Sequence, residues 1–394
     1  MLEQKIRNTQ IVVLPSWYPN KLDKFAGDFI QRHVKAISAL RSQYVIYVVK
    51  DEFAKITNDV FIDTIKESHY TEKIIYYHSK KTGIKYVDKF LSQLKFNQLY
   101  YRALKEYVHL NGIPPLIHVH VILKAGLVAL WAKSKWNIPF IISEHWSVFL
   151  EEANYKIKHL PVFHQWSIKK ILKNALAITV VSDRLGISIS KKYKAPDYTV
   201  IPNVVDHSIF FPGEDFINDR LAFIHVSSMV YEKNTESILM AFSILKKNKV
   251  DCILNLYGPA PDSLKVLAKD LGLGDMIFFR GEVDQKILAG KMQQSAALIL
   301  YSRFETFGCV LIEANAVGIP VIVSDLPVFH ELITESENGF FVESNNAQAL
   351  ANKIIEFISS TKSFDSRQVV KSTEKYSFSN IAKQFDNLYS RFIS

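Results

Sequence analysis

The sequence predicts an α/β protein built from two doubly wound parallel-sheet domains that face each other. Twelve short, β-branched apolar runs bounded by turn residues recur along its 394 residues. They lack polar alternation, and helix-period segments separate most of them, which is typical of parallel sheets covered by helices on both faces. One interruption, at residues 201–215 with Pro202, Pro212 and Gly213, divides the runs into two series, so we expect one domain per series.

Each series contains six predicted strands. The first comprises Gln10–Pro15, Tyr44–Val49, Lys73–Tyr77, Leu116–His120, Pro139–Ser143 and Ala177–Ser182. The second comprises Ala222–Ser227, Cys252–Tyr257, Met276–Phe279, Ala297–Tyr301, Pro320–Ser324 and Gly339–Val342. Open parallel sheets bind ligands at the carboxyl ends of their strands, so we expect functional residues in the loops that follow strands, at a cleft between the two sheets.

The composition is that of a soluble globular protein. With 48% hydrophobic and 22% charged residues, it excludes a disordered chain and a disulfide scaffold. The two cysteines, Cys252 and Cys309, have no metal-ligand spacing and indicate a reducing compartment. The apolar run Ile11–Leu14 is too short for a signal peptide, and no stretch approaches about 20 apolar residues. We therefore expect a cytoplasmic protein.

Positive charge is concentrated in the first half of the chain. Residues 1–200 carry a net charge of +14 and residues 201–394 a net charge of −5. A basic half attracts phosphates or an anionic membrane surface. No nucleic-acid recognition motif accompanies this charge, so we expect no nucleic-acid partner.

A basic helix is predicted within residues 85–108. Its expected apolar face contains Val87, Leu91, Leu94, Tyr101, Leu104 and Val108. Its cations lie largely elsewhere, at Lys85, Lys89, Lys95, Arg102 and Lys105. Two interpretations remain open: a helix packed on its own domain with a solvated basic face, or one that also rests on an anionic bilayer, giving peripheral contact with the inner face of the membrane.

Residues 297–325 carry the clearest chemical pattern, a strand, a short loop, a helix and a second strand. Gly308 opens the helix, which leaves the backbone amides around Phe307, Gly308, Cys309 and Val310 free to bind an anion such as a pyrophosphate. Cys309 therefore contributes its amide, and an activated thiolate is the less favoured explanation of its position.

Two carboxylates flank this helix start. Glu313 lies about 7.5 Å along the helix axis, a distance that suits the ribose of a bound nucleotide. Glu305 precedes the helix and faces the other end, where a sugar on the second phosphate would lie. The structural alternative is that both acids only complement the helix N-terminus, which is worth about 0.3–1 kcal/mol each.

Glu305, seven intervening residues and Glu313 resemble the E-x7-E signature of family 4 of the retaining glycosyltransferases. Ser302, Phe307-Gly308, Glu313-Ala314 and the G-x-P-V of Gly318 to Val321 match its surroundings. The resemblance continues in LPSWYPN, IHVH (117–120), IPFIISEHW (138–146), TVVSDRL (179–185) and VIPNVVDHSIFFP (200–212). It implies the GT-B fold, two facing Rossmann-like domains with a cleft between them.

The resemblance also implies the domain limits. FSNIAKQFDNLYSRF (378–392) is similar to the family's terminal helix, which crosses back onto the first domain. The expected acceptor-binding domain is therefore residues 1–202 plus 372–394, and the expected nucleotide-sugar-binding domain is residues 203–371.

Further site residues follow from matched motifs. The resemblance implies catalytic roles for His145 and Glu305, which would contact the donor sugar, and a phosphate-facing loop at Gly27. Donor-binding roles are implied for the second-domain positions Lys233, Arg280, Thr306, Phe307, Gly308, Cys309, Val310 and Glu313. Lys233 matches the lysine that neutralises the donor's phosphates, whereas Ser228 replaces the family's arginine. Lys233 and the helix amides could compensate, or Arg303 or Arg280 could turn in.

The expected reaction is retaining transfer of a hexose or N-acetylhexosamine from a nucleotide-diphosphate sugar, with UDP favoured and GDP second. The chain contains no Asp-x-Asp, so we expect no metal and no cofactor. The expected acceptor is a glycan, lipid-linked rather than soluble, in surface polysaccharide or lipopolysaccharide synthesis. The alternative is a non-catalytic sugar-nucleotide-binding protein of the same fold. The serine at position 228, where the family has an arginine, motivates this alternative.

Overall fold

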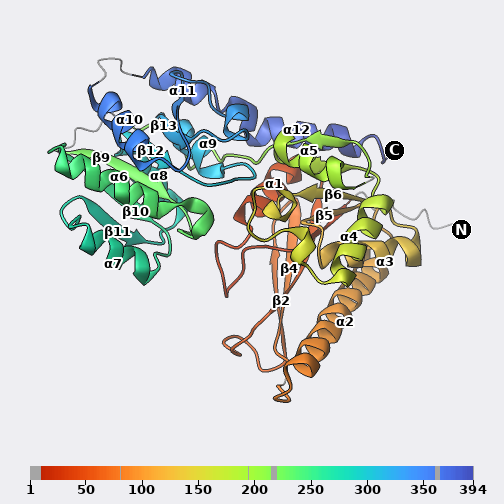
Figure 1. Cartoon of the computed structure of the whole chain (residues 1–394). Coiled ribbons are helices and arrows are strands. Elements are labelled where there is room, and N and C mark those ends of the chain that lie inside the picture. Colours follow the sequence, from red (N-terminus) through yellow and green to blue (C-terminus); the bar gives the residue numbers. More distant parts are fainter. Residues whose placement is uncertain (1–9, 80, 194, 214–219, 360–363, 394) are drawn as a thin grey trace, which may run out of the picture.

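The computed structural model describes residues 10–79, 81–193, 195–213, 220–359 and 364–393. It contains two α/β units, each with its own sheet, that lie side by side (Figure 1). No helix among the described residues combines the length and apolar character needed to cross a bilayer.

The first sheet has eight strands in the order β3-β4-β2-β1-β5-β6-β7-β8. Their bounds are β1 Ile11–Pro15, β2 Gln43–Lys50, β3 Val60–Lys66, β4 Tyr70–Tyr77, β5 Ile117–His120, β6 Phe140–Glu144, β7 Ile178–Val180 and β8 Tyr198–Val200. All neighbours pair in parallel except β3 and β4, which are antiparallel. The strand order reverses between β1 and β5, so the crevice at this switch point is a preferred ligand position.

The second sheet has six parallel strands in the order β11-β10-β9-β12-β13-β14. Their bounds are β9 Leu221–Val226, β10 Cys252–Tyr257, β11 Ile277–Gly281, β12 Ala297–Leu300, β13 Val321–Ser324 and β14 Gly339–Val342. Its switch point lies between β9 and β12, so the loops that begin at Ser227 and Tyr301 emerge beside each other.

Helices cover the two sheets (Figure 1). Their bounds are α1 Asp28–Ser38, α2 Lys85–Asn111, α3 Ala125–Trp136, α4 Val162–Asn174, α5 Asp183–Lys192, α6 Thr235–Lys247, α7 Asp262–Asp270, α8 Gln285–Gln293, α9 Cys309–Ala316, α10 Ala347–Ser359, α11 Ser366–Lys371 and α12 Phe378–Tyr389. This arrangement confirms the predicted pair of parallel-sheet domains.

The C-terminal helix α12 packs on the first unit, not on the second unit that precedes it in sequence (Figure 1). Its buried face, with Ile381 and Phe385, shares an apolar cluster with Ile37 of α1 and Ile141 of β6. Arg41 also pairs with Asp386 at 2.5 Å. The chain therefore crosses between the units twice.

The face of α2 that packs on the sheet differs from the predicted one. Its buried residues are Ser92, Phe96, Tyr100, Ala103, Leu104 and Tyr107. Of the predicted face only Leu104 is buried, whereas Val87, Leu91 and Leu94 are exposed. The prediction was wrong for the first turns of the 27-residue helix, whose apolar residues face solvent. It was right for its second half, where Leu104 is buried and half-buried Tyr101 and Val108 pack on the core.

Two strands were not predicted, and both lie at an edge of the first sheet. β3 is exposed along nearly its whole length, and β8 has only three half-buried residues. β3 (VFIDTIK) does carry β-branched and apolar residues, so a strand signal was present there and was overlooked, whereas β8 is too short to give a pattern.

Candidate active site

Two adjoining cavities lie between the units, and the walls of both contain Cys309 and Val310 at the start of α9. We call the smaller, of about 480 Å³, the Glu313 cavity, because Glu313 lines it. We call the larger, of about 720 Å³, the Glu305 cavity, since it contains Glu305 and His145. Ser228, at the end of β9, faces both. The loops that follow β1, β6, β9 and β12 thus meet at one place.

The start of α9 has the backbone geometry of an anion site. Gly308 precedes the helix with φ +96°, a left-handed conformation that favours glycine, and provides no side-chain cap. The first amides, those of Cys309 and Val310, lie where both cavities meet. The positive end of the helix dipole points at the same position, so a phosphate group would be stabilised there.

Glu305 lies in the loop between β12 and α9 and is held by two neighbours. Its Oε1 accepts hydrogen bonds from Lys233 Nζ at 2.5 Å and from the hydroxyl of buried Ser302 at 3.0 Å. The predicted phosphate-binding lysine and the predicted sugar-binding carboxylate therefore form an ion pair in the Glu305 cavity. An arriving anion would compete with Glu305 for Lys233.

Glu313 pairs with a cation from the other unit. Arg32 of α1 donates to Glu313 at 2.6 Å and to Asp28 at 3.0 Å, and both members of the 32–313 pair are buried. Burial alone lowers the pKa of Arg32, but Glu313 and Asp28 outweigh it and raise the pKa overall, so the guanidinium stays charged. Burial raises the pKa of Glu313, although Arg32 opposes this rise. Glu313 still lines its cavity.

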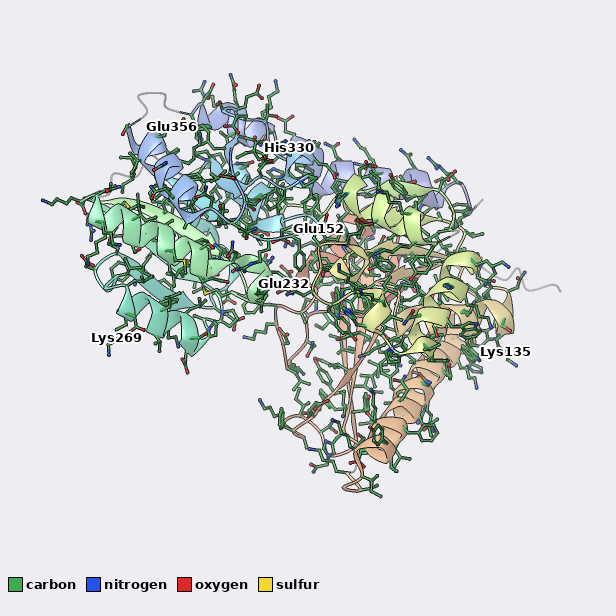
Figure 2. All side chains as sticks on the ribbon, viewed as in Figure 1. Lys135, Glu152, Glu232, Lys269, His330 and Glu356 are labelled. Carbon is green, nitrogen blue, oxygen red and sulfur yellow. The ribbon has the colours of Figure 1, made fainter. Side chains whose placement is uncertain are left out.

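Further contacts cross the same seam. Ser182 donates to the carbonyl of Thr306 at 2.7 Å, and Gln285 donates to Asp28 at 2.9 Å. Figure 2 shows Glu152 and Glu232 where the two units face each other, with Lys269 and Glu356 at the outer end of the second unit. Side-chain contacts to both backbone and side-chain atoms therefore hold the two units together around the two cavities.

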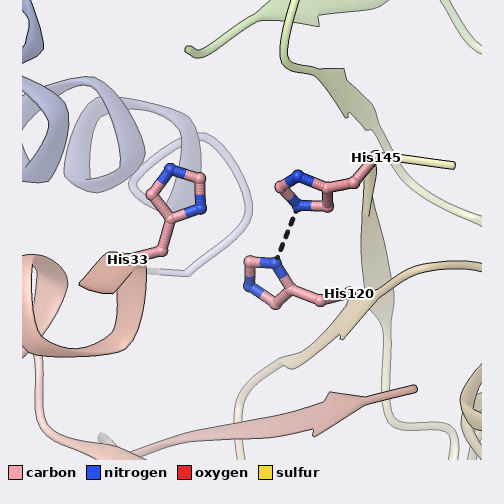
Figure 3. Close-up of side chains that lie close together, drawn as sticks. All are labelled: His33, His120 and His145. Carbon is pink, nitrogen blue, oxygen red and sulfur yellow. Dashed lines mark hydrogen bonds between the residues drawn. The ribbon is translucent and has the colours of Figure 1, made fainter. Parts of the chain in front are cut away.

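His145 follows β6 and belongs to a buried histidine cluster, with His120 at the end of β5 and His33 on α1 (Figure 3). His120 Nδ1 and His145 Nε2 are 3.3 Å apart, and Phe29 packs on the His145 ring with a centroid distance of 4.8 Å. Glu144 accepts the backbone N–H groups of His145 and Trp146, both at 2.8 Å, which fixes the loop that carries His145.

All three imidazoles are neutral at physiological pH. Burial, opposed by the carbonyl of Pro202 and reinforced by Arg32, lowers the pKa of His33 to about 4. Burial and the neighbouring imidazoles also hold the pKa of His120 and His145 well below the ordinary histidine value. His145 can therefore act as a neutral hydrogen-bonding group at the wall of the Glu305 cavity.

Within the described part of the chain, His33, His120 and His145 are also the one group of possible metal ligands that lies close together, with ligand atoms within 4.8 Å. A metal fits them poorly. His120 Nδ1 and His145 Nε2 already form a hydrogen bond with each other. The other ring nitrogens, His120 Nε2 and His145 Nδ1, have no partner, whereas the second nitrogen of a metal-bound histidine normally donates to a carboxylate or carbonyl. We therefore assign the cluster no metal.

Most predicted site residues line the two cavities: His145, Lys233, Glu305, Thr306, Phe307, Gly308, Cys309, Val310 and Glu313. Arg280 does not; it hydrogen-bonds Asn255 at 2.8 Å and lines a separate cavity of about 420 Å³. Burial raises the pKa of the Cys309 thiol to about 12, so this thiol stays protonated.

Gly27 lies behind the cavity wall, between lining residues Ala26 and Asp28. It has φ +64°, and a Cβ there would lie 2.7 Å from the backbone carbonyl of Trp17. The close approach of Trp17 is sufficient to require glycine, so the predicted phosphate contact at Gly27 stays a prediction.

Arg32 and its partner Asp28 were not predicted as site residues. Both lie on α1 one turn apart, directly after the loop from the first strand. The available signal was a cationic residue in the helix that follows the first strand of a parallel sheet. This signal is weak, because only the pairing of Arg32 with Glu313, 281 residues away, distinguishes Arg32 from a surface arginine.

Comparisons with known proteins agree with this geometry. The family described as Glycosyltransferase Family 4 matches residues 59–209, and the family described as Glycosyl transferases group 1 matches residues 208–375. An uncharacterised glycosyltransferase of Methanocaldococcus jannaschii is 28% identical over 176 residues, 44% of this chain and 45% of that protein. The matches span about half the length of the first curated relatives.

Solved structures share the whole fold. Sucrose-phosphate synthase from Thermosynechococcus elongatus has a TM-score of 0.76 and 22% identity, covering 97% of this chain and 98% of its own. HepE of Anabaena, in complex with UDP and glucose, has a TM-score of 0.72 and 17% identity, covering 97% of this chain and 100% of its own. The two family models meet where the two sheets meet. The chain therefore has the GT-B fold, and each of its two units is similar to a family of glycosyltransferases.

Proposed function

We propose that the chain transfers a hexose or N-acetylhexosamine from a nucleotide-diphosphate sugar, UDP-linked in the first instance, to an acceptor hydroxyl with retention of anomeric configuration. The observation that carries this proposal is the placement of Glu305 and Glu313 on either side of the amides that open α9. A diphosphate at these amides would direct its ribose into the Glu313 cavity and its sugar into the Glu305 cavity. UDP bound to HepE, which has the same fold, supports the choice of base.

In this arrangement each residue has a defined role. Glu305 and neutral His145 hydrogen-bond the donor sugar from opposite units, while Lys233 and the α9 amides bind the phosphates. Glu313 accepts hydrogen bonds from the ribose. Phosphate charge is met by a lysine and by backbone amides, so we expect transfer to proceed without a metal ion and to survive EDTA.

A screen of nucleotide diphosphates tests the donor. Thermal shifts with UDP, GDP and ADP identify the base, and transfer assays with the corresponding sugar nucleotides follow. We expect Glu305→Gln to reduce kcat about 10²–10³-fold, and the exposed control Glu337→Gln to leave it unchanged. If UDP stabilises the protein but no donor is hydrolysed or transferred, the non-catalytic binding function replaces this one.

We further propose that the acceptor is lipid-linked and reached at an anionic membrane. The first turns of α2 expose Tyr86, Phe90 and Leu94 next to Lys85 and Lys89, on a part of the first unit that projects away from the second (Figure 1). On α4, exposed Phe163 and Trp166 extend the apolar surface. Burial and then Lys89 lower the pKa of His164 on α4, which indicates that the two surfaces are close. Aromatic and cationic side chains together are typical of bilayer contact.

Vesicle sedimentation tests this contact. We expect the protein to sediment with phosphatidylglycerol vesicles, to be released by salt, and not to sediment with phosphatidylcholine alone. Phe90→Asp should weaken sedimentation, while Val266→Asp, an equally exposed apolar position on α7 of the second unit, should not. Absence of sedimentation at every ionic strength would leave a soluble glycan as the acceptor.

A further inference from the structure

Ser228 brings no positive charge to the proposed donor site, where a departing diphosphate needs one. It is exposed at the end of β9 and faces both cavities, at the position where the resembled family has an arginine. A hydroxyl can donate one hydrogen bond to a phosphate but brings no positive charge. A diphosphate that leaves with its bonding electrons gains negative charge, so a compensating cation is expected close to Ser228.

The two arginines of the second unit that could turn in are engaged elsewhere. Arg303 pairs with Glu236 at 2.5 Å and stacks on Tyr231, with its guanidinium 4.1 Å from the ring centroid. Arg280 hydrogen-bonds Asn255, stacks on Phe278 and lines the separate cavity described above. Neither lines the Glu313 or the Glu305 cavity.

Arg32 is in the required place, although it comes from the first unit. It is the one cation among the described residues that line the Glu313 cavity, where Ser228, Cys309 and Val310 form the adjoining wall. Two of its nitrogens are held by Glu313 and Asp28, and its buried Nε has no partner. A buried donor without an acceptor is costly, and a phosphate oxygen would satisfy it.

We propose that Arg32 is the guanidinium that binds the donor's diphosphate in place of an arginine at position 228, and that Glu313 holds it until the donor arrives. This inference rests on the proposed function. When ribose hydroxyls engage Glu313, Arg32 exchanges a carboxylate for a phosphate and stays paired with Asp28. The site is thereby complete only when the two units are closed on each other, because the guanidinium and the α9 amides belong to different units.

The charge balance of transfer gives Arg32 its role. The bond between the anomeric carbon and the diphosphate oxygen breaks, and its electron pair goes to that oxygen. The acceptor hydroxyl oxygen forms the new bond to the anomeric carbon, and its proton goes to the departing diphosphate. Arg32 and Lys233 stabilise the negative charge on the diphosphate as it develops, so Arg32 is a catalytic residue by direct contact with the leaving group.

A transplanted arginine tests the assignment. We expect Arg32→Met to lower kcat about 10²–10³-fold, and the double variant Arg32→Met with Ser228→Arg to recover at least about tenfold of that loss, because it returns the guanidinium from the other side of the same cavity. Arg32→Met should also weaken inhibition by UDP more than inhibition by UMP, since only UDP carries the second phosphate. A merely structural role would affect both nucleotides equally and would not be repaired at position 228.

Each outcome decides between the two proposals. If the unaltered protein transfers no sugar from any nucleotide-diphosphate donor, the proposed function is wrong. If it does, but folded Arg32→Met retains its kcat and its preference for UDP over UMP, the Arg32 assignment is overturned. Thermal unfolding of each variant identifies loss of folding, and where Arg32→Met fails to fold, Arg32→Lys gives the same comparison with a charge that cannot bridge two oxygens.

Discussion

The two walls of the cleft differ in their chemistry and in how directly the sequence encodes them. The wall from the second unit is contiguous: Glu305, the α9 amides and Glu313 lie within nine residues. The wall from the first unit is assembled from the loop after β1, from α1 and from the loop after β6. It supplies the imidazole of His145, which a sequence motif indicated, and the guanidinium of Arg32, which no motif indicated. In the proposed function, the contiguous segment of the second unit binds the donor, and the facing wall is free to vary with the acceptor.

The largest expected effect is on the free energy of unfolding, and it should come from α12, which packs behind the first-unit wall. Phe385 of α12 is fully buried and packs on His33 and His118, with ring centroids 5.3 and 5.4 Å away. We expect Phe385→Ala to destabilise the protein by about 3–5 kcal/mol because it leaves a cavity beneath the histidine cluster. Urea denaturation measures this, and half-buried Phe392 on the same segment is the control, with a smaller cost on truncation. Equal costs for both would show that α12 does not support this wall.

The second prediction separates the two carboxylates of the second-unit wall. Glu305→Gln should act mainly on kcat, because the donor sugar carries the reacting carbon, whereas Glu313→Gln should raise the donor KM about tenfold with a smaller change in kcat. Steady-state kinetics with varied donor concentration give both parameters. A matching loss of kcat in both variants would mean that the ribose is not held by Glu313.

The last prediction concerns the protonation of the histidines behind the first-unit wall. Burial lowers the pKa of His33 to about 4 and that of His118 to about 3, from an ordinary value of 6.5. The unfolded chain therefore binds protons that the folded chain excludes, so stability is complete above about pH 6.5 and falls as the pH is lowered toward 4. Each histidine contributes up to about 1.4 kcal/mol per pH unit in this window.

Urea denaturation between pH 7 and pH 5 measures this dependence. His118→Gln should reduce the slope of stability against pH, even if it lowers stability at pH 7 by removing the 2.7 Å contacts to Tyr389 and Ser143. His69→Gln, at an exposed turn between β3 and β4, is the control and should leave the slope unchanged. A flat profile in the unaltered protein would mean that the cluster takes up protons without unfolding.

Much of this molecule follows from the sequence alone. The twelve predicted strands were recognisable because their short apolar runs differ from the helix-period segments between them. The positive φ of Gly308 agrees with its predicted place at the start of α9. The exposed end of α2 did not follow, because its apolar residues face solvent and their spacing does not reveal that. The exposure of β3 did not follow either, since its sequence VFIDTIK contains the same residue types as a buried strand.

Only the tertiary structure decided which charges meet. Glu305 and Glu313 were identified as candidates from eight residues of spacing, but their partners are Lys233 and Arg32, 72 and 281 residues away. Hydrophobic periodicity and helix capping depend on residues that are close in the sequence. An ion pair across a cleft depends instead on how the two sheets are positioned, and many contacts between the two units determine that position. The sequence thus determined most of the elements and the loop that carries Glu305 and Glu313, and the fold determined which cation meets each carboxylate.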